Sequence, residues 1–172
     1  MHDDTQVGRV IVMGKALRNG QFPVRWVSDL GYGYGYPLFN YYGPLPYYVG
    51  GFLYALGLPA VEATKVMFLI GFILSAITMY LLSSTWFGAS GGLLSAVLYL
   101  YAPYHAVEAY VRGAVGELWA FAFLPLAVWG FLCLPDDAKR KSALLIGGIG
   151  LAGVILSHTI LGYVTVAFYV AG

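Results

Sequence analysis

Two aspartates at the start of the chain are the first candidates for a chemical role. Asp3 and Asp4 follow His2 and precede a stretch in which apolar residues recur at helical spacing. A carboxylate at a membrane surface can act as a general base or bind a divalent cation, and His2 could add a ligand. Asp is also a favoured N-cap residue that interacts well with the helix dipole. The pattern therefore supports either a catalytic or metal-binding role or a purely structural one.

A second charged group lies in the middle of the chain. Glu108 and Arg112 are four residues apart, the spacing of a helical ion pair, and Glu117 follows in the first turn of an apolar segment. The planar guanidinium of Arg112 is suited to hold a phosphate. The structural alternative is an ion pair, with Glu117 serving only as a partner of the helix dipole.

His158 and Thr159 stand within a long apolar stretch. Ionisable residues at membrane depth are costly, and they usually face a cavity or the interior of a bundle. We therefore expect His158 either to line a cavity at membrane depth or to hold helices together by a hydrogen bond.

The sequence GYGYGYP occupies residues 31–37. It has no Lys followed by Ser or Thr, and its glycine spacing does not fit the dinucleotide fingerprint, so it is not a phosphate-binding loop. The tyrosines fit an aromatic belt at the membrane interface. They equally fit a wall for a sugar or an isoprenoid chain, which glycines would let the backbone approach closely.

The composition is that of an integral membrane protein. Of the 172 residues, 60% are hydrophobic and 10% are charged, whereas soluble domains have roughly 45–50% apolar and about 25% charged residues. So few polar groups cannot cover a water-facing surface. The net charge of +1 gives no nucleic-acid footprint, and a single cysteine, Cys133, rules out a disulfide framework.

We predict an all-α, polytopic transmembrane bundle that crosses the bilayer about four times. A hydrocarbon core about 30 Å thick requires about 20 apolar residues in a helix. The expected spans run from about Val61 to Leu82, Ser90 to Tyr104, Val115 to Leu134 with a kink at Pro125, and Ser142 past Ser157 to the end, the last one in a single part or in two parts. The chain stops inside this last apolar stretch, which favours a fragment of a larger protein.

Residues 1–60 differ in character and are predicted to form an external loop with interfacial helices, while residues 61–172 form the transmembrane helices. From Thr5 to Asn19 we expect an amphipathic interfacial helix whose apolar positions are Val7, Val10, Ile11, Gly14 and Leu17. A structured loop rich in Gly, Pro and Tyr follows. Leu45 to Gly57 reads as a helix too short to span the membrane easily.

Basic residues give conflicting signals about orientation. The short loop with Lys139, Arg140 and Lys141 favours a cytoplasmic position, which would place the N-terminal segment outside. That segment carries four basic residues of its own, which favour the opposite orientation: Arg9, Lys15, Arg18 and Arg25.

The run from His2 to Gly57 resembles the first external loop of GT-C-type membrane glycosyltransferases. It is most similar to the membrane proteins labelled as related to 6-pyruvoyl-tetrahydropterin synthase, and the resemblance extends through EAYVRGAVGELWAFAFLPL and LSHT. The label implies no pterin chemistry. In the GT-C pattern, an acidic residue after a first membrane helix is the base or metal ligand, and here it corresponds to Asp3 or Asp4. The turn corresponds to Gly20, Pro23 and Trp26, with slightly longer spacing, and the aromatic segment to Tyr36, Pro37, Phe39, Tyr42 and Pro44. The family's first membrane helix is missing here.

The resemblance implies transfer of a sugar from a polyprenyl-phosphate donor to an acceptor on the non-cytoplasmic side of the plasma membrane. Asp3 or Asp4 would be the catalytic base or hold a divalent cation. Arg112 and Glu117, with Tyr36, Tyr42 and His158, would bind the substrate, and this fragment would be inactive alone. A transporter or lipid flippase lined by His158, Glu117 and Arg112 is an alternative, as is a non-catalytic protein of the same fold. The transporter reading predicts internal repeats, and none is evident.

Overall fold

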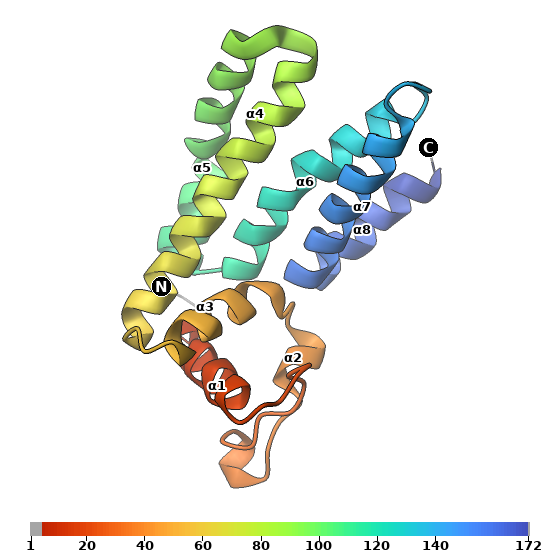
Figure 1. The fold of residues 1–172 in the computed structure, drawn as a ribbon. Helices are drawn as coiled ribbons and strands as arrows, with labels where there is room; N and C mark the ends of the chain where they lie inside the picture. The colour runs from red at the N-terminus through yellow and green to blue at the C-terminus, as the bar shows by residue number, and fades with distance from the viewer. Residues whose placement is uncertain (1–4, 172) are drawn as a thin grey trace.

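The computed structural model describes residues 5–171, which form helices joined by short connections (Figure 1). Within this range the backbone pairing typical of strands is limited to an isolated bridge between Val27 and Tyr36. The predicted all-α class is confirmed. The helices are α1 (Gln6–Arg18), η1 (Gly31–Gly33), α2 (Leu38–Tyr41), α3 (Leu45–Ala55), α4 (Ala60–Leu100), α5 (Pro103–Ala106), η2 (Val107–Arg112), α6 (Val115–Cys133), α7 (Arg140–Ser157) and α8 (Thr159–Ala171).

Three of these helices, α4, α6 and α7, are long and apolar enough to cross a membrane, and α8 is a shorter apolar helix. At 1.5 Å per residue, α4 would be about 60 Å long if straight, roughly twice the thickness of a hydrocarbon core. It is interrupted at Gly88, whose φ of 68° lies in the region that favours glycine. Figure 1 shows the chain reversing there, so that α4 has an outgoing and a returning arm. The spans predicted from Val61 to Leu82 and from Ser90 to Tyr104 correspond to these arms.

Helix α6 continues through Pro125 without a non-helical residue. A proline has no N–H, so the carbonyl of Phe121, four residues earlier, loses its helical donor. The Tyr99 hydroxyl, from the returning arm of α4, donates to that carbonyl at 2.9 Å. The hydrogen bond therefore satisfies a backbone group that lipid could not, and it ties α4 to α6.

Small residues bring α6 and α7 into close contact. A Cβ added at Gly147 of α7 would lie 2.8 Å from the Cα of Gly130 on α6, and one at Gly150 would overlap the backbone of Ala127. Without a hydrophobic driving force between helices in lipid, such close backbone approach is a principal source of association.

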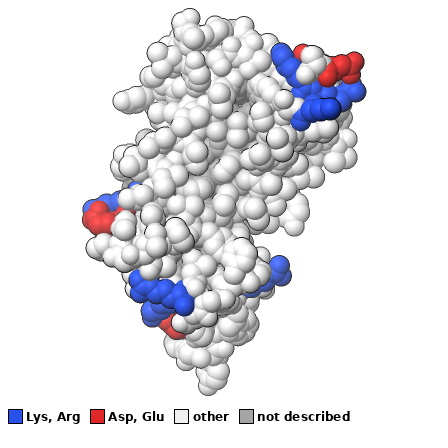
Figure 2. Space-filling model, viewed as in Figure 1, with Lys and Arg blue, Asp and Glu red and all other residues white. Residues whose placement is uncertain are grey.

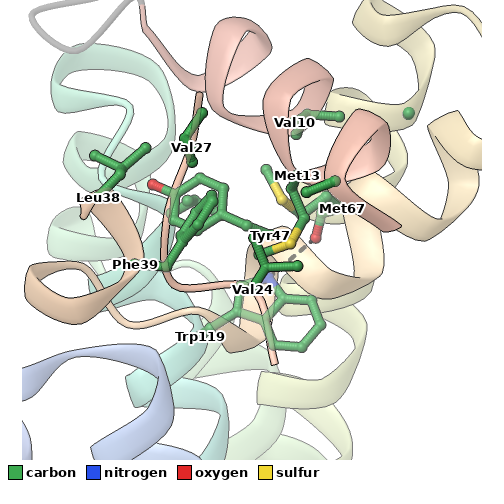
Figure 3. Packing of buried hydrophobic residues seen from close by; sticks show 12 residues of the cluster. Val10, Met13, Val24, Val27, Leu38, Phe39, Tyr47, Met67 and Trp119 are labelled. Carbon is green, nitrogen blue, oxygen red and sulfur yellow. Dashed lines mark hydrogen bonds between the residues drawn. The ribbon is translucent and has the colours of Figure 1, made fainter. Parts of the chain in front are cut away.

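The N-terminal segment sits on the ends of α4 and α6 opposite the loop that joins α6 to α7 (Figure 1). Its helices α1 and α3 pack against each other and against α4. Figure 3 shows Met13 and Tyr47 beside Met67 and Trp119, and the Trp119 indole N–H donates to the Met67 carbonyl at 3.1 Å. Burying a methionine or similar side chain contributes roughly 1.5–3 kcal/mol. One hydrophobic cluster therefore joins the segment to the bundle.

The face that α1 buries coincides only in part with the predicted one. Of the expected stripe, Val10 and Gly14 are buried, whereas Val7, Ile11 and Leu17 are only partly buried. Gln6, Met13 and Ala16 are buried as well. The reason is that α3 packs directly on α1: a Cβ at Gly14 would lie 2.7 Å from the Gly51 carbonyl oxygen. Helix α3 is 11 residues long and belongs to this layer, as its short predicted length indicated.

Charged side chains gather toward the two ends of the molecule, and an uncharged surface lies between them (Figure 2). At one end, the loop between α6 and α7 holds the ion pairs Asp136–Lys139 and Asp137–Arg140. At the other, Lys15 of α1 pairs with Asp29 at 2.6 Å, which raises the pKa of Lys15 and lowers that of Asp29. This distribution suits a bilayer around the middle of the bundle.

Replacement of Gly147 by leucine is expected to lower the free energy of unfolding by about 1–3 kcal/mol, because the new side chain has no space against Gly130. Gly148→Leu is the matched control, since a Cβ at this exposed neighbour meets nothing within 4 Å. Thermal unfolding of both variants in detergent measures the difference. Equal melting temperatures for the two variants would show that the packing of α6 on α7 is not tight at this point.

Candidate functional site

A pocket opens where the N-terminal segment meets the ends of three membrane-associated helices. Its volume is ≈ 280 Å³. It lies at the start of α6, at the break between α7 and α8, and beneath α1 and the segment after α2. The residues that line it are Gln6, Arg9, Tyr41, Tyr42, Gly43, Tyr47, Arg112, Ala114, Val115, Gly116, Glu117, Ser157, His158, Thr159 and Ile160.

Two glycines allow these elements to meet. A Cβ at Gly43 would overlap the carbonyl of Ser157, and one at Gly116 would lie 2.8 Å from the Ser157 carbonyl oxygen. The carbonyl of Ser157, the last residue of α7, therefore lies between Gly43, in the loop after α2, and Gly116, in the first turn of α6. Larger residues at either position would separate the loop from the bundle and distort the pocket.

Arg112 is the centre of a charged cluster on one wall of the pocket. Its Nη1 lies 2.6 Å from Glu117 Oε2 and 2.5 Å from Glu108 Oε1, and Nη2 lies 3.4 Å from Glu117 Oε1. The Tyr104 hydroxyl accepts from Arg112 at 3.2 Å and donates to Glu117 at 3.2 Å. The hydrogen bond that Arg112 donates to Glu117, followed by the two carboxylate charges, raises the pKa of Arg112 above its usual range. The guanidinium is therefore a fixed cation.

The two glutamates differ in their surroundings. The Glu117 side chain is 15% exposed and faces the pocket, whereas that of Glu108 is 0% exposed, behind Arg112. Burial, and then the nearby Glu117, raise the pKa of Glu108 to about 7, although Arg112 acts in the opposite direction. Burial therefore favours the protonated form of Glu108.

His158 lies at the break between two helices, which agrees with the two-part alternative for this apolar stretch but corrects the expectation that His158 is embedded in a helix. Helix α7 ends at Ser157, α8 begins at Thr159, and His158 between them has an extended backbone with φ −149° and ψ 113°. Its Nδ1 accepts the Leu161 N–H at 3.3 Å and so caps the first turn of α8. The expectation failed because hydropathy stays high through residues 142–171, and only the cap ends one helix and starts the next.

The capping bond also fixes how His158 faces the site. If Nδ1 is the acceptor, the proton of the neutral ring is on Nε2. That atom lies 3.5 Å from Glu117 Oε1. Glu117 therefore stands between Arg112 and His158 and links η2, α6 and the α7–α8 break.

A second arginine reaches the same pocket from the N-terminal segment. Arg9 of α1 donates to the Tyr47 hydroxyl at 3.1 Å, and its guanidinium lies 4.1 Å from the centre of the Tyr42 ring. Tyr47 in turn donates to Gln6, which donates to the Gly113 carbonyl at 2.8 Å. The sequence analysis considered Arg9 only as one of the basic residues that bear on orientation. Its i, i+3 relation to the buried Gln6 was the available signal, and it became meaningful only with α3 in place.

Two helix N-termini add to the positive potential. The first residues of α6 and α8 line the pocket, and α6 has no capping side chain. Free N–H groups and the helix dipole favour an anion at such ends. The C-terminus of α7, at Ser157, and the Glu117 carboxylate offset part of this effect. With Arg9 and Arg112 both in the lining, the arrangement suits a singly or doubly charged phosphate more than a cation.

The predicted site residues are only partly brought together. Arg112, Glu117, Tyr42 and His158 line the pocket. Tyr36 does not; it pairs with Val27 and contacts the Tyr41 ring, with 6.4 Å between ring centres. The other predicted residues, His2, Asp3 and Asp4, lie outside the described part of the chain.

Metal binding at this pocket gains no support from residues 5–171. No group of three or more His, Cys, Asp or Glu in that range is arranged to hold an ion. Of the pocket's own side chains, the carboxylate of Glu117 is engaged by Arg112 and His158. A role for the predicted divalent cation therefore depends on Asp3 and Asp4.

Comparison with known proteins identifies the family to which the chain belongs. Residues 39–171 match the family described as 6-pyruvoyl-tetrahydropterin synthase related domain, membrane protein. No curated protein and no solved structure matches the chain. Because the match covers well over half of the chain, the protein belongs to this membrane-protein family, as its resemblance indicated. The match includes the Arg112 cluster and His158, and it begins after the two aspartates.

Replacement of Glu108 by glutamine is expected to change how stability depends on pH. The folded protein raises the pKa of Glu108 above its ordinary value of 4.5, so protonated Glu108 favours the folded state. This stabilisation is complete below the ordinary pKa and is lost as pH rises through about 7. Melting temperatures measured from about pH 4 to about pH 8 should fall more steeply in the native protein than in Glu108→Gln.

Glu62→Gln is the control, because Glu62 is exposed and pairs only with Lys65 in the first turns of α4. It should retain the native pH dependence. Identical slopes for the native protein and Glu108→Gln would show that Glu108 is not the titrating group.

Proposed function

We propose that this member of the 6-pyruvoyl-tetrahydropterin synthase-related membrane family is part of a glycosyltransferase. Its donor is a sugar linked to a polyprenyl phosphate, and its acceptor lies on the non-cytoplasmic side of the plasma membrane. The observation that carries the proposal is the pocket in which Arg9 and Arg112 converge from two separate parts of the chain. The resemblance of residues 2–57 to GT-C loops supports the same class.

The position of the pocket suits a lipid-borne phosphate. Its lining comes from the start of α6, the α7–α8 break and the N-terminal segment, and that segment lies at one end of the bundle (Figure 1). A lipid whose chain lies in the bilayer presents its phosphate at this level. The pocket's opening beside the exposed Tyr42 offers an aromatic face against which a sugar can pack.

In the proposed reaction, Asp3 or Asp4 removes the proton from an acceptor hydroxyl, and the oxygen attacks the anomeric carbon with inversion. The bond from that carbon to the phosphate oxygen breaks, and the phosphate leaves with the electron pair. Negative charge therefore grows on the phosphate in the transition state, where prearranged cations are most effective. Arg112 and Arg9 supply that charge, and Glu117 and His158 hold Arg112 in place.

The orientation follows from the two ends of the bundle. The short basic loop from Lys139 to Lys141 is at the end opposite the N-terminal segment (Figure 1). We assign this loop to the cytoplasm by the positive-inside tendency of short loops. The pocket then faces the other side.

Replacing Arg112 or Arg9 by glutamine in the full-length protein is expected to reduce kcat for sugar transfer by about a hundredfold or more, because a prearranged charge is lost. Arg25→Gln is the matched control: Arg25 is exposed and lies outside the pocket lining. The assay follows a radiolabelled sugar from a short-chain polyprenyl-phosphate donor to product. Native activity in both pocket variants would exclude the pocket from catalysis.

Asp3→Asn and Asp4→Asn address the proposed base in the same assay. Loss of transfer with donor binding retained is expected for the aspartate that removes the proton. Unchanged transfer in both variants, and in the double variant, would remove the aspartates from the mechanism. Movement of the intact lipid across vesicles without a new glycosidic product would favour the transporter alternative.

A further inference from the structure

Glu108 is an ionisable side chain that the proposed reaction does not use. Its side chain is 0% exposed, and Oε1 is held by Arg112. Its second carboxylate oxygen is buried and has no hydrogen-bond partner within the described chain. An unpaired buried charged oxygen is costly, and protonation removes the charge. Glu108 is therefore placed to change its protonation state when its surroundings change.

Among residues 5–171, the charged and hydrogen-bonding neighbours of Glu108 come from three elements. Arg112 comes from its own segment, Glu117 from α6 and Tyr104 from α5. The neighbouring His105 on α5 is buried among aromatic rings, and burial lowers its pKa, which keeps it neutral. His158 reaches the cluster only through Glu117. Arg112 is therefore the one cation among these groups, and it faces two carboxylates.

The excess of negative charge around Arg112 weakens the binding of an anion. With both glutamates ionised, the one positive charge of Arg112 faces two negative charges. A phosphate that approaches Arg112 must compete with both carboxylates and is repelled by them. Loss of the Glu108 charge leaves Arg112 paired only with Glu117, and its remaining N–H groups can then turn toward the pocket. The π-helical hydrogen bonding of η2, often found at functional sites, places Glu108 and Arg112 together at this point.

We propose that an anion bound in the pocket enters together with a proton, which Glu108 takes up. Glu108 is then a positioning residue that acts through Arg112 and does not touch the ligand. The inference rests on the proposed function, since the natural anion would be the phosphodiester of the lipid-linked donor. Coupling of this kind is reciprocal, so that a lower pH strengthens anion binding as much as the anion strengthens proton binding.

Titration calorimetry of the full-length protein tests the coupling. The probe is dihexyl phosphate, a phosphodiester that keeps one negative charge throughout the range. Measurements in two buffers with different ionisation enthalpies give the number of protons taken up per anion bound. We expect uptake of a fraction of a proton near neutral pH, and an affinity that falls by up to about tenfold per pH unit at higher pH.

Two variants show which residue takes up the proton. Glu108→Gln, which is permanently neutral, should bind the probe with no proton uptake and with an affinity independent of pH. Glu62→Gln should behave as the native protein does, because Glu62 lies outside the pocket. The native measurement alone decides whether binding is coupled to a proton, so the test does not depend on how well the variants fold.

The outcomes separate this inference from the proposed function. Binding of the probe without proton uptake overturns the coupling but leaves the phosphate site intact. Proton uptake that persists in Glu108→Gln overturns the assignment to Glu108. Failure of the native protein to bind the probe at any pH overturns both the coupling and the phosphate site.

Discussion

The ion pair between Arg112 and Glu117 is the interaction on which the rest of the site depends. Arg112 ends η2 and Glu117 lies in the first turn of α6, so the pair closes the turn at Gly113 between them. Glu117 also reaches His158 at the break between α7 and α8. Three helix ends are thereby fixed at one level of the bundle. At a membrane boundary such ends need polar partners, because lipid provides none.

The N-terminal segment completes the pocket because its packing allows a close approach. The buried Gln6 donates to the Gly113 carbonyl, and Gly43 lies against the carbonyl of Ser157. Apolar contacts of Met13 and Tyr47 with Met67 and Trp119 hold the N-terminal segment against the bundle (Figure 3). The same docking that buries this cluster carries Arg9 to the pocket that Arg112 also lines. Stability of the segment and formation of the anion site are therefore parts of one arrangement.

Much of the fold follows from local sequence signals. Composition indicates a membrane protein, apolar stretches locate α4, α6 and α7, and the i, i+4 spacing of Glu108 and Arg112 predicts their pairing. The place of Glu117 in a first turn is likewise readable. These features depend on neighbours along one helix, which is why periodicity and spacing can identify them.

Features that depend on tertiary contacts could not be read in this way. Arg9 belongs to the pocket only because α3 buries one face of α1, and that face coincides only in part with the one that apolar spacing indicated. His158 looked like a residue inside a long apolar helix, but its side chain caps α8 and marks a break. The Ser–His–Thr sequence at residues 157–159, with its polar capping types, was the local sign of that break.

A double-mutant cycle between Arg112 and Glu117 is the most direct test of the central interaction. Unfolding free energies of the native protein, Arg112→Gln, Glu117→Gln and the double variant, measured in detergent, give the coupling between the two side chains. The structure predicts a favourable coupling of about 1 kcal/mol or more, as for contacting charged residues in one network. Additive effects, with a coupling within about 0.3 kcal/mol of zero, would contradict it.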